Sequence, residues 1–333
     1  MKVHELGEFD LIRMLNEIVN NGGAGSCAIP DLLIGIGDDA TAWRTDATVQ
    51  LGTTDILIQD VHFSVKTTSW HDLGWKALAA NISDIAAMGG TPTYALVSLG
   101  LPPDIEADHI AELYLGIAEI AKEFNMAIAG GDISKSPMIV ISPSVIGQVG
   151  RGQLLTRSGA MPGDCIAVTG YLGSSAAGLK MAHGQLVFKP EIASVLNEAH
   201  LRPYPRVSEG QTLAKYGVKA AIDISDGLIA DLGHICEMSK VGAMIRLMDV
   251  PIHPTVRTAF EDVAFDLALT GGEDYELLFT APLEMIESVS ASIPITVIGE
   301  ITEDKSGKVL VLDEDGNAID WSRGGWEHFR NRD

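Results

Sequence analysis

The sequence predicts a mixed α/β or α+β protein with two domains, and three observations support this prediction. Strand and helix patterns alternate between residues 93 and 149, the turn-rich stretch 151–163 interrupts them, and a new alternation begins with the apolar strand 165–168. A chain of 333 residues, 46% of them hydrophobic, can bury a sizeable core in each domain. We therefore expect domains at 1–150 and 151–333, although patterns alone do not decide the topology.

The individual elements follow from hydrophobic periodicity. In the first domain we expect helices at 8–19, 70–88 and 105–124 and strands at 49–58, 93–99, 126–129 and 138–149. In the second domain we expect strands at 165–168, 220–224, 243–247, 276–280, 295–298 and 309–312 and helices at 176–181 and 228–239. His71 and Asp72 are placed to cap the helix 70–88. Asn81 and Asp84, three residues apart, then point from one face of that helix.

The charge balance excludes several classes of partner. Lys and Arg number 23 against 45 Asp and Glu, so the formal net charge is −22. Nucleic acids and anionic membranes both require a basic face, so neither is expected as a partner. Most of these carboxylates are expected to lie on a solvated surface.

Cysteine usage and the start of the chain favour a cytoplasmic protein. Cys27, Cys165 and Cys236 are widely spaced and form no Cys-x-x-Cys pair, so neither a disulfide framework nor a structural zinc site is expected. The first residues lack the apolar stretch of a signal peptide, and no segment is long and apolar enough to span a bilayer.

A subset of the carboxylates lies in apolar or glycine-rich segments, where an unpaired charge is costly. Lysine and arginine are scarce beside these motifs, so divalent cations are the better partners. The motifs are Gly37-Asp38-Asp39, Thr53-Thr54-Asp55, Asn81-Ile-Ser-Asp84, Gly130-Gly131-Asp132, Asp223-Ile-Ser225-Asp226 and Gly271-Gly272-Glu273-Asp274. Hydroxyl and carboxylate oxygens are the hard ligands that magnesium prefers.

The motifs differ in strength when each is taken alone. Asp223-Ile-Ser225-Asp226 is the strongest, because the two-residue period of a strand places Asp223 and Ser225 on one face. Helix capping explains Ser225 or Asp226 but not a carboxylate at 223 in an apolar strand. Gly130-Gly131-Asp132 is equally compatible with a close phosphate approach and with a tight turn after a strand.

The absence of several known motifs limits the reactions that the sequence can support. The sequence contains no Gly-x-x-x-x-Gly-Lys-Ser/Thr loop and no protein-kinase signature, and Gly170-x-x-Gly173 is too weak to indicate a nucleotide. Several metal-ligating carboxylates without a positioned base fit phosphoryl transfer to an acceptor that is already anionic. A phosphomonoester, with a second pKa of about 6, is such an acceptor. A non-catalytic module that binds divalent cations or nucleotides and a metal-dependent phosphatase remain alternatives.

The ordered motifs resemble those of the thiamine-monophosphate kinases, a family of the aminoimidazole ribonucleotide synthetase-like superfamily. The resemblance extends nearly from end to end. Besides the motifs above it includes Gly7-Glu8-Phe9, Val61-His62-Phe63, Lys76 to Gly89, Leu155-Thr156-Arg157-Ser-Gly159, Tyr275-Glu276-Leu277 and Gly325-Trp326-Glu327-His328-Phe329. It implies transfer of the γ-phosphoryl group of ATP to thiamine monophosphate with Mg²⁺. It also implies a homodimer in which N-terminal domains pair their sheets and C-terminal α/β domains flank them.

The resemblance also implies roles for residues of this sequence. The implied magnesium ligands are Asp39, Thr53, Thr54, Asp55, Asp84, Asp132, Asp223 and Asp226, of which Asp39, Asp55, Asp84 and Asp132 would be catalytic. The implied ATP contacts are Tyr114, Gly131, Asp132, Arg157 and Ser225. The implied thiamine phosphate contacts are His62, Glu273 and Trp326. An aromatic face and a carboxylate both favour the fixed positive charge of a thiazolium ring.

Other ATP-dependent enzymes of the superfamily are the nearest alternatives. Selenophosphate synthetases carry a reactive cysteine followed by lysine, whereas Ala28 follows Cys27 here. Hydrogenase-maturation relatives end in a functional cysteine, whereas this chain ends in Asp333. These differences favour the thiamine-monophosphate kinase assignment.

Overall fold

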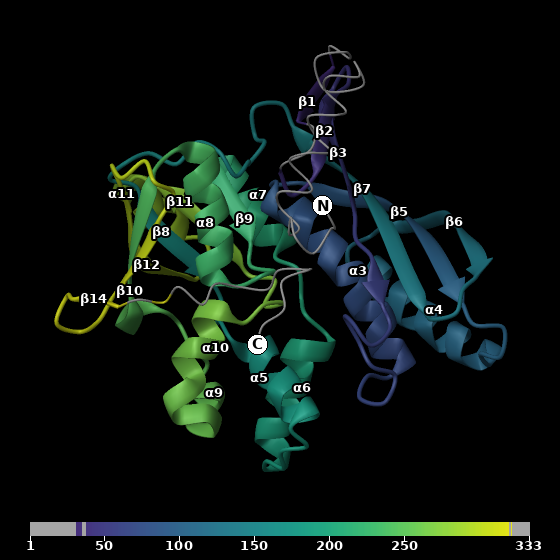
Figure 1. Cartoon of the computed structure of the whole chain (residues 1–333). Coiled ribbons are helices and arrows are strands. Elements are labelled where there is room, and N and C mark those ends of the chain that lie inside the picture. Colours follow the sequence, from purple (N-terminus) through teal and green to yellow (C-terminus); the bar gives the residue numbers. More distant parts are fainter. Residues whose placement is uncertain (1–30, 35–37, 320, 322–333) are drawn as a thin grey trace, which may run out of the picture.

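Two seven-stranded sheets lie on either side of the long helix α3 (Trp70–Ala87), as Figure 1 shows. The computed structural model describes residues 31–34, 38–319 and 321. The expected helix 8–19, Cys27 and Trp326 therefore lie outside the described residues.

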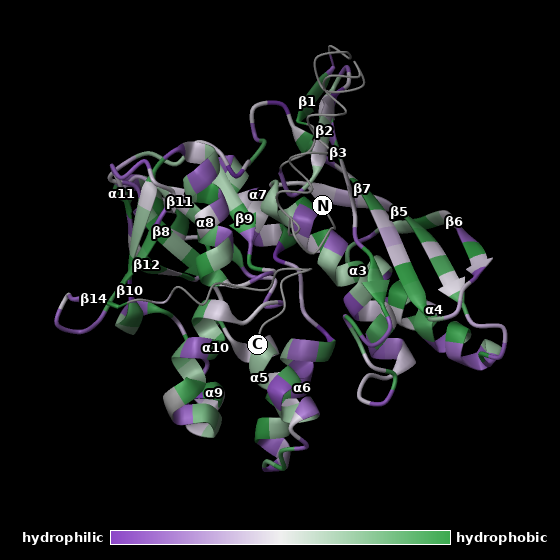
Figure 2. Cartoon of the chain, in the orientation of Figure 1, coloured by the Kyte–Doolittle hydropathy of each residue, from purple (hydrophilic) through white to green (hydrophobic). Residues whose placement is uncertain are grey.

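The first sheet has the order β1-β2-β3-β7-β5-β6, with β4 paired to β7. Its strands are β1 (Leu32–Ile34), β2 (Thr41–Arg44), β3 (Thr48–Thr54), β4 (Leu57–Ile58), β5 (Thr91–Leu101), β6 (Ala127–Lys135) and β7 (Val140–Gly150). β5 and β6 are parallel, and the other pairs are antiparallel. Green bands alternate with paler ones along β5 and β7 in Figure 2, as expected for a sheet with one face on a core.

Helices α3 and α4 (Ala107–Glu123) pack against each other beside this sheet. α3 is buried on nearly all sides, because the first sheet, α4 and the second half of the chain all contact it. Ser69 caps α3: its hydroxyl accepts from the Asp72 backbone N–H at 3.1 Å and donates to the Asp72 carboxylate at 2.7 Å. We expected His71 and Asp72 to cap this helix. The capping residue is instead Ser69, two residues before His71, and Asp72 is its hydrogen-bonding partner.

The second sheet has the order β14-β13-β10-β12-β8-β11-β9. Its strands are β8 (Cys165–Thr169), β9 (Ala220–Asp223), β10 (Gly242–Arg246), β11 (Leu277–Ala281), β12 (Ile295–Thr302), β13 (Val309–Leu312) and β14 (Ala318–Ile319). Only β10 and β13 are parallel among the pairs of the described part of this sheet. The predicted mixed α/β class is confirmed.

The helices of the second half complete the fold. They are α5 (Ser174–His183), α6 (Pro190–Leu201), α7 (Val207–Tyr216), α8 (Leu228–Ser239), α9 (Pro254–Phe260), α10 (Ala264–Thr270) and α11 (Leu283–Ser290), with 3₁₀ turns η2 (Leu247–Asp249) and η3 (Glu261–Val263). α7 packs on α3 so closely that a Cβ at Gly210 would lie 2.1 Å from the carbonyl oxygen of Ala86. One apolar cluster therefore contains residues of both halves, including Ala87, Leu213 and Phe279.

The region around Gly130 differs from the expectation of a strand that ends at 129. β6 continues to Lys135, and a register shift beside Gly130 keeps it paired with β5. Gly131 is needed there because a Cβ would lie 1.9 Å from the carbonyl oxygen of Val97. The tight-turn alternative for this motif is therefore wrong, and Asp132 lies exposed on a sheet strand.

Among the described helices, none is long and apolar enough to cross a membrane.

Candidate active site

Three buried or half-buried carboxylates converge between the two sheets and form what we call the acidic cluster. Asp39 lies between β1 and β2, Asp84 lies near the end of α3, and Asp223 is the last residue of β9. One carboxylate oxygen from each residue lies within 4.8 Å of the others. The fold thus brings together three of the motifs that the sequence singled out.

Each carboxylate of the acidic cluster has one short polar contact. Arg157 donates to Asp39 at 2.7 Å, and Thr53 at the end of β3 donates to Asp84 at 2.6 Å. Asp223 accepts from the Ser83 hydroxyl at 2.6 Å. Asn81, on the same face of α3 as Asp84, accepts from the Asp55 backbone N–H at 3.1 Å.

Burial and repulsion by neighbouring carboxylates disfavour the ionised forms of Asp84 and Asp223, and burial does so for Asp55. Burial, followed by the charges of Asp55, Asp223 and Asp39, raises the pKa of Asp84 well above its usual value. Burial, followed by the charge of Asp39, raises the pKa of Asp223 to about 8. Burial also raises the pKa of Asp55 to about 6. A divalent cation would remove this repulsion, since it favours the ionised form of every carboxylate around it.

The donor set fits magnesium. Oδ2 of Asp39 is buried, and no donor among the described residues reaches it. A buried carboxylate oxygen without a partner is costly and is the atom that a hard cation would satisfy. Carboxylate and hydroxyl oxygens line this place, whereas Arg157 is the one cation in contact with the acidic cluster among the described residues.

Asp38 supports the position of Arg157. The Asp38 carboxylate accepts the backbone N–H of Arg157 at 3.2 Å and that of Asp39 at 3.0 Å. Burial, followed by the charge of Asp39, raises the pKa of Asp38 to about 7. Burial works against the charge of Arg157, but Asp39 and Asp38 more than offset it and raise the pKa of the guanidinium.

The loop that follows β9 is held by an internal carboxylate. One oxygen of Asp231 accepts the backbone N–H groups of Ser225, Asp226 and Gly227 at 3.0–3.1 Å. Free N–H groups at the start of a helix favour an anion, but here the Asp231 carboxylate occupies them. Asp226, Asp231 and His234 also place ligand atoms within 4.8 Å of one another.

Glu273 lies in a second polar group, close to the same loop. Its backbone has φ 65° and its N–H donates to the carbonyl oxygen of Ser225 at 2.8 Å. Its Oε2 accepts from Lys76 of α3 at 2.8 Å and lies 3.6 Å from Nδ1 of His200. Burial opposes the ionised form, but Lys76, His200 and His62 together lower the pKa of Glu273. His62 and Glu273, both predicted substrate contacts, are therefore close enough to interact electrostatically with each other.

Family models and relatives match this chain over nearly its whole length. The family of AIR synthase related proteins matches with its N-terminal domain at residues 37–149 and its C-terminal domain at 161–312. The thiamine-monophosphate kinase of Bacillus subtilis strain 168 is 38% identical over 308 residues, which are 89% of this chain and 94% of the relative. That of Escherichia coli K12 is 37% identical over 331 residues, or 97% and 98% of the two chains.

The chain belongs to the thiamine-monophosphate kinase family. A solved structure of AaThiL complexed with AMPPCP and TMP agrees with this membership: its TM-score is 0.87 at 33% identity, covering 98% of this chain and 99% of that one. The resemblance drawn from the motifs is confirmed, and so is the two-domain fold that it implied.

Other predicted residues of this family member lie at or beyond the edge of the acidic cluster. The Thr54 hydroxyl donates to the Pro143 carbonyl oxygen and accepts from Ser144, both on β7. Gly131 and Asp132 lie exposed on β6, where the Ser134 hydroxyl is 3.5 Å from Asp132. Tyr114 is half-buried on α4 and packs against the N-terminal core.

Several supporting residues were missed by sequence reasoning. Lys76 and Ser83 stand out only as polar residues in the otherwise apolar helix α3, and that pattern was the available signal. Asp38 is part of a quoted motif but received no role. Asp231 lies one turn into α8, where a carboxylate is common for reasons of helix capping alone.

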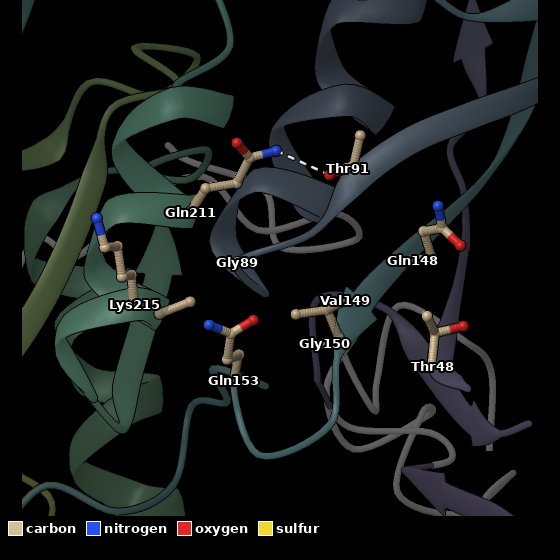
Figure 3. A pocket seen from close by; sticks show the side chains of 10 residues that line it. Thr48, Gly89, Thr91, Gln148, Val149, Gly150, Gln153, Gln211 and Lys215 are labelled. Carbon is tan, nitrogen blue, oxygen red and sulfur yellow. Dashed lines mark hydrogen bonds between the residues drawn. The ribbon is translucent and has the colours of Figure 1, made fainter. Parts of the chain in front are cut away.

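An open cavity beside α7 lies away from these groups. Its volume is about 360 Å³, and Figure 3 shows it between Thr48, Gln148, Gln153, Gln211 and Lys215. Thr48 starts β3 whereas Thr53 lies near its other end, about 16 Å away along the strand. We therefore assign the candidate active site to the acidic cluster and not to this cavity.

Proposed function

We propose that this chain transfers the γ-phosphoryl group of ATP to thiamine monophosphate, which gives thiamine diphosphate and ADP. The observation that supports the proposal most directly is the full-length likeness to AaThiL complexed with AMPPCP, an ATP analogue, and TMP. The convergence of Asp39, Asp84 and Asp223 adds a place for the metal that polyphosphate transfer requires.

The proposal assigns the metal to the acidic cluster and its surroundings. Asp39, Asp84 and Asp223 would hold Mg²⁺, with Thr53, Thr54, Asp55, Asp132 and Asp226 as further ligands of metal or metal-bound water. Bound Mg²⁺ would neutralise phosphate charge and align phosphate oxygens. Thr53 and Ser83 keep the Asp84 and Asp223 carboxylates in place through hydrogen bonds of 2.6 Å.

ATP would be held by residues of both halves. Gly131 and Asp132 present exposed backbone and a carboxylate on β6, and Arg157 brings a cation to the edge of the acidic cluster. Ser225 and Tyr114 complete the proposed set. A guanidinium is suited to phosphate oxygens because its N–H donors form a planar fork.

Thiamine monophosphate would be held by Glu273, His62 and Trp326. A carboxylate and an aromatic face both stabilise the thiazolium cation. No general base is needed, since a phosphomonoester with a second pKa of about 6 is already a dianion near neutral pH. We propose direct in-line transfer, in which the acceptor phosphate oxygen bonds to the γ-phosphorus as the bond to the β-phosphate bridging oxygen breaks.

The domain and assembly assignments are also proposals. Residues 1–150 would bind ATP and metal and form the dimer, and residues 151–333 would form the C-terminal α/β domain, in a cytoplasmic protein. Large apolar side chains on the open face of the first sheet support a homodimer: Tyr94, Leu96 and Ile133 are 53%, 43% and 63% exposed. An uncovered sheet face of this kind favours association with a second copy.

The test is incubation of the protein with MgATP and thiamine monophosphate, with products separated by chromatography. Thiamine diphosphate and ADP should appear in equal amounts, and Asp84→Asn protein prepared in parallel should give neither. Release of free phosphate alone, or consumption of free thiamine instead of its phosphate, would refute the assignment. A protein-bound phosphoryl group from γ-labelled ATP that is chased into product would refute direct transfer.

A further inference from the structure

Lys76 is a buried lysine that the proposed reaction does not use. It lies on α3, and only 3% of its side-chain surface is exposed. Its ammonium group donates to Oε2 of Glu273 at 2.8 Å and lies 3.4 Å from Nδ1 of His200. A buried ammonium is costly unless it is paired and hydrogen-bonded. Glu273 therefore stabilises Lys76, and Lys76 in turn determines where the Glu273 carboxylate lies.

His200 is the third residue that contacts Lys76 and Glu273, and it carries no charge near neutral pH. Its Nδ1 is 3.1 Å from the Ser175 hydroxyl, and its ring is buried between α5 and α3. Burial, followed by the charge of Lys76, lowers the pKa of His200 to about 4. The imidazole is consequently neutral near pH 7. The ion pair in this group is therefore the one between Lys76 and Glu273.

Glu273 is fixed at its backbone and at one carboxylate oxygen. Its N–H donates to Ser225, and its φ of 65° is a left-handed conformation that few side-chain-bearing residues adopt. Among the described residues, the Lys76 ammonium and the neutral His200 ring both lie at Oε2, at 2.8 Å and 3.6 Å. The side chain nevertheless remains 31% exposed, so part of it faces open space.

We propose that Lys76 is a positioning residue for substrate binding: it holds Oε2 of Glu273 and leaves Oε1 for the cationic ring of the substrate. The inference rests on the proposed function, because it requires Glu273 to meet a thiazolium cation. α3 also carries Ser83, seven residues further on, which holds Asp223 of the acidic cluster. One rigid helix thus fixes a carboxylate in the substrate subsite and another in the metal subsite.

A double-mutant cycle on thiamine monophosphate affinity tests the inference. Wild type, Lys76→Met, Glu273→Gln and the double variant are compared by calorimetry, with thermal unfolding to confirm that each is folded. Lys76→Met should raise the dissociation constant by about tenfold, because an unheld carboxylate loses pre-organisation. The double variant should bind no more weakly than Glu273→Gln alone, because Lys76 acts through Glu273.

Steady-state kinetics give a second readout that does not depend on Glu273→Gln folding. Lys76→Met should raise KM for thiamine monophosphate about tenfold while KM for ATP changes less than about twofold. Arg202→Met is the matched control: it breaks a different ion pair to α3, with Asp72 at 3.3 Å, and should leave both KM values within about twofold.

Two results would overturn the inference. Additive losses in the double variant would mean that Lys76 contacts the substrate itself, and an unchanged dissociation constant in a less stable Lys76→Met would mean a purely structural role. Wild-type protein that binds thiamine monophosphate but does not phosphorylate it would refute only the proposed function. Wild-type protein that does not bind it would refute both.

Discussion

Asp84→Asn should make the metal-free protein more stable while it strongly lowers turnover. The substitution keeps the shape of the side chain and its ability to accept the Thr53 hydroxyl, but it removes one negative charge from the acidic cluster. Two unit charges 4.8 Å apart repel by about 3.5 kcal/mol at an effective dielectric constant of about 20. Arg157 offsets the charge of Asp39, so the repulsion between Asp84 and Asp223 is the main one relieved.

We expect a gain in the free energy of unfolding of about 1–3 kcal/mol near pH 8.5, once the cost of placing an amide there is subtracted. The gain should be smaller at low pH, because burial raises the pKa of Asp84 and the wild-type carboxylate loses its charge as the pH is lowered. Urea unfolding in EDTA, followed by circular dichroism, measures both values. Glu112→Gln, at an exposed site on α4, is the control and should stay within about 0.5 kcal/mol of wild type.

Turnover should fall by about a hundredfold or more in the same variant, because a metal ligand is lost. The reasoning would be refuted by an Asp84→Asn protein that is less stable than wild type by about 1 kcal/mol in EDTA at high pH. Near-normal turnover would refute the metal role.

Three further predictions follow from the site and the first sheet. The pKa of Asp223 is raised, so the folded state binds protons more tightly and metal-free stability should fall as pH rises from about 4 to about 8, with Mg²⁺ restoring Tm at the upper end. Arg157→Met leaves the fully buried Asp39 side chain without its cation and should cost about 3 kcal/mol in urea unfolding. Gly131→Ala would place a Cβ 1.9 Å from the Val97 oxygen, so it should cost about 2 kcal/mol or more and weaken self-association in size-exclusion chromatography.

Each of these three predictions has a control variant or an outcome that would contradict it. Tm that rises between about pH 5 and pH 8 in EDTA would contradict the sign of the first. Adding Asp39→Asn to Arg157→Met should recover most of the lost stability, and no recovery would mean that Arg157 acts elsewhere. Gly233→Ala has no atom within 4 Å of its new Cβ, so it should leave stability equal or improved, unlike Gly131→Ala.

Local patterns in the sequence predicted the individual pieces of the site well. α3 spans 70–87 against the expected 70–88, and Asn81 and Asp84 point from one face as their spacing required. Patterns could not show that Asp39, Asp84 and Asp223 meet, because their approach depends on pairings between strands far apart in the chain. The family resemblance supplied that knowledge, not the periodicity.

Tertiary pairing overrode local signals in other places. Gly130 and Gly131 indicated the end of a strand, yet β6 continues because β5 offers a parallel partner and the bulge absorbs the extra residue. Helices α6 and α7 were not predicted, although α7 packs directly on α3. No sequence motif pointed to Asp231, and only the folded loop shows that it binds three backbone N–H groups.

The position of α3 between the two sheets has a consequence for how the protein is made. Asp223 follows Asp84 by 139 residues, so at about 5–20 residues per second it leaves the ribosome roughly 7–28 s later. During that interval Ser83 lacks its partner Asp223, and Lys76 lacks its partner Glu273. The face of α3 that carries these two polar side chains is not yet covered by the second half of the chain. A nascent chain therefore cannot assemble the acidic cluster early, and its metal affinity should appear only once both halves have been synthesised.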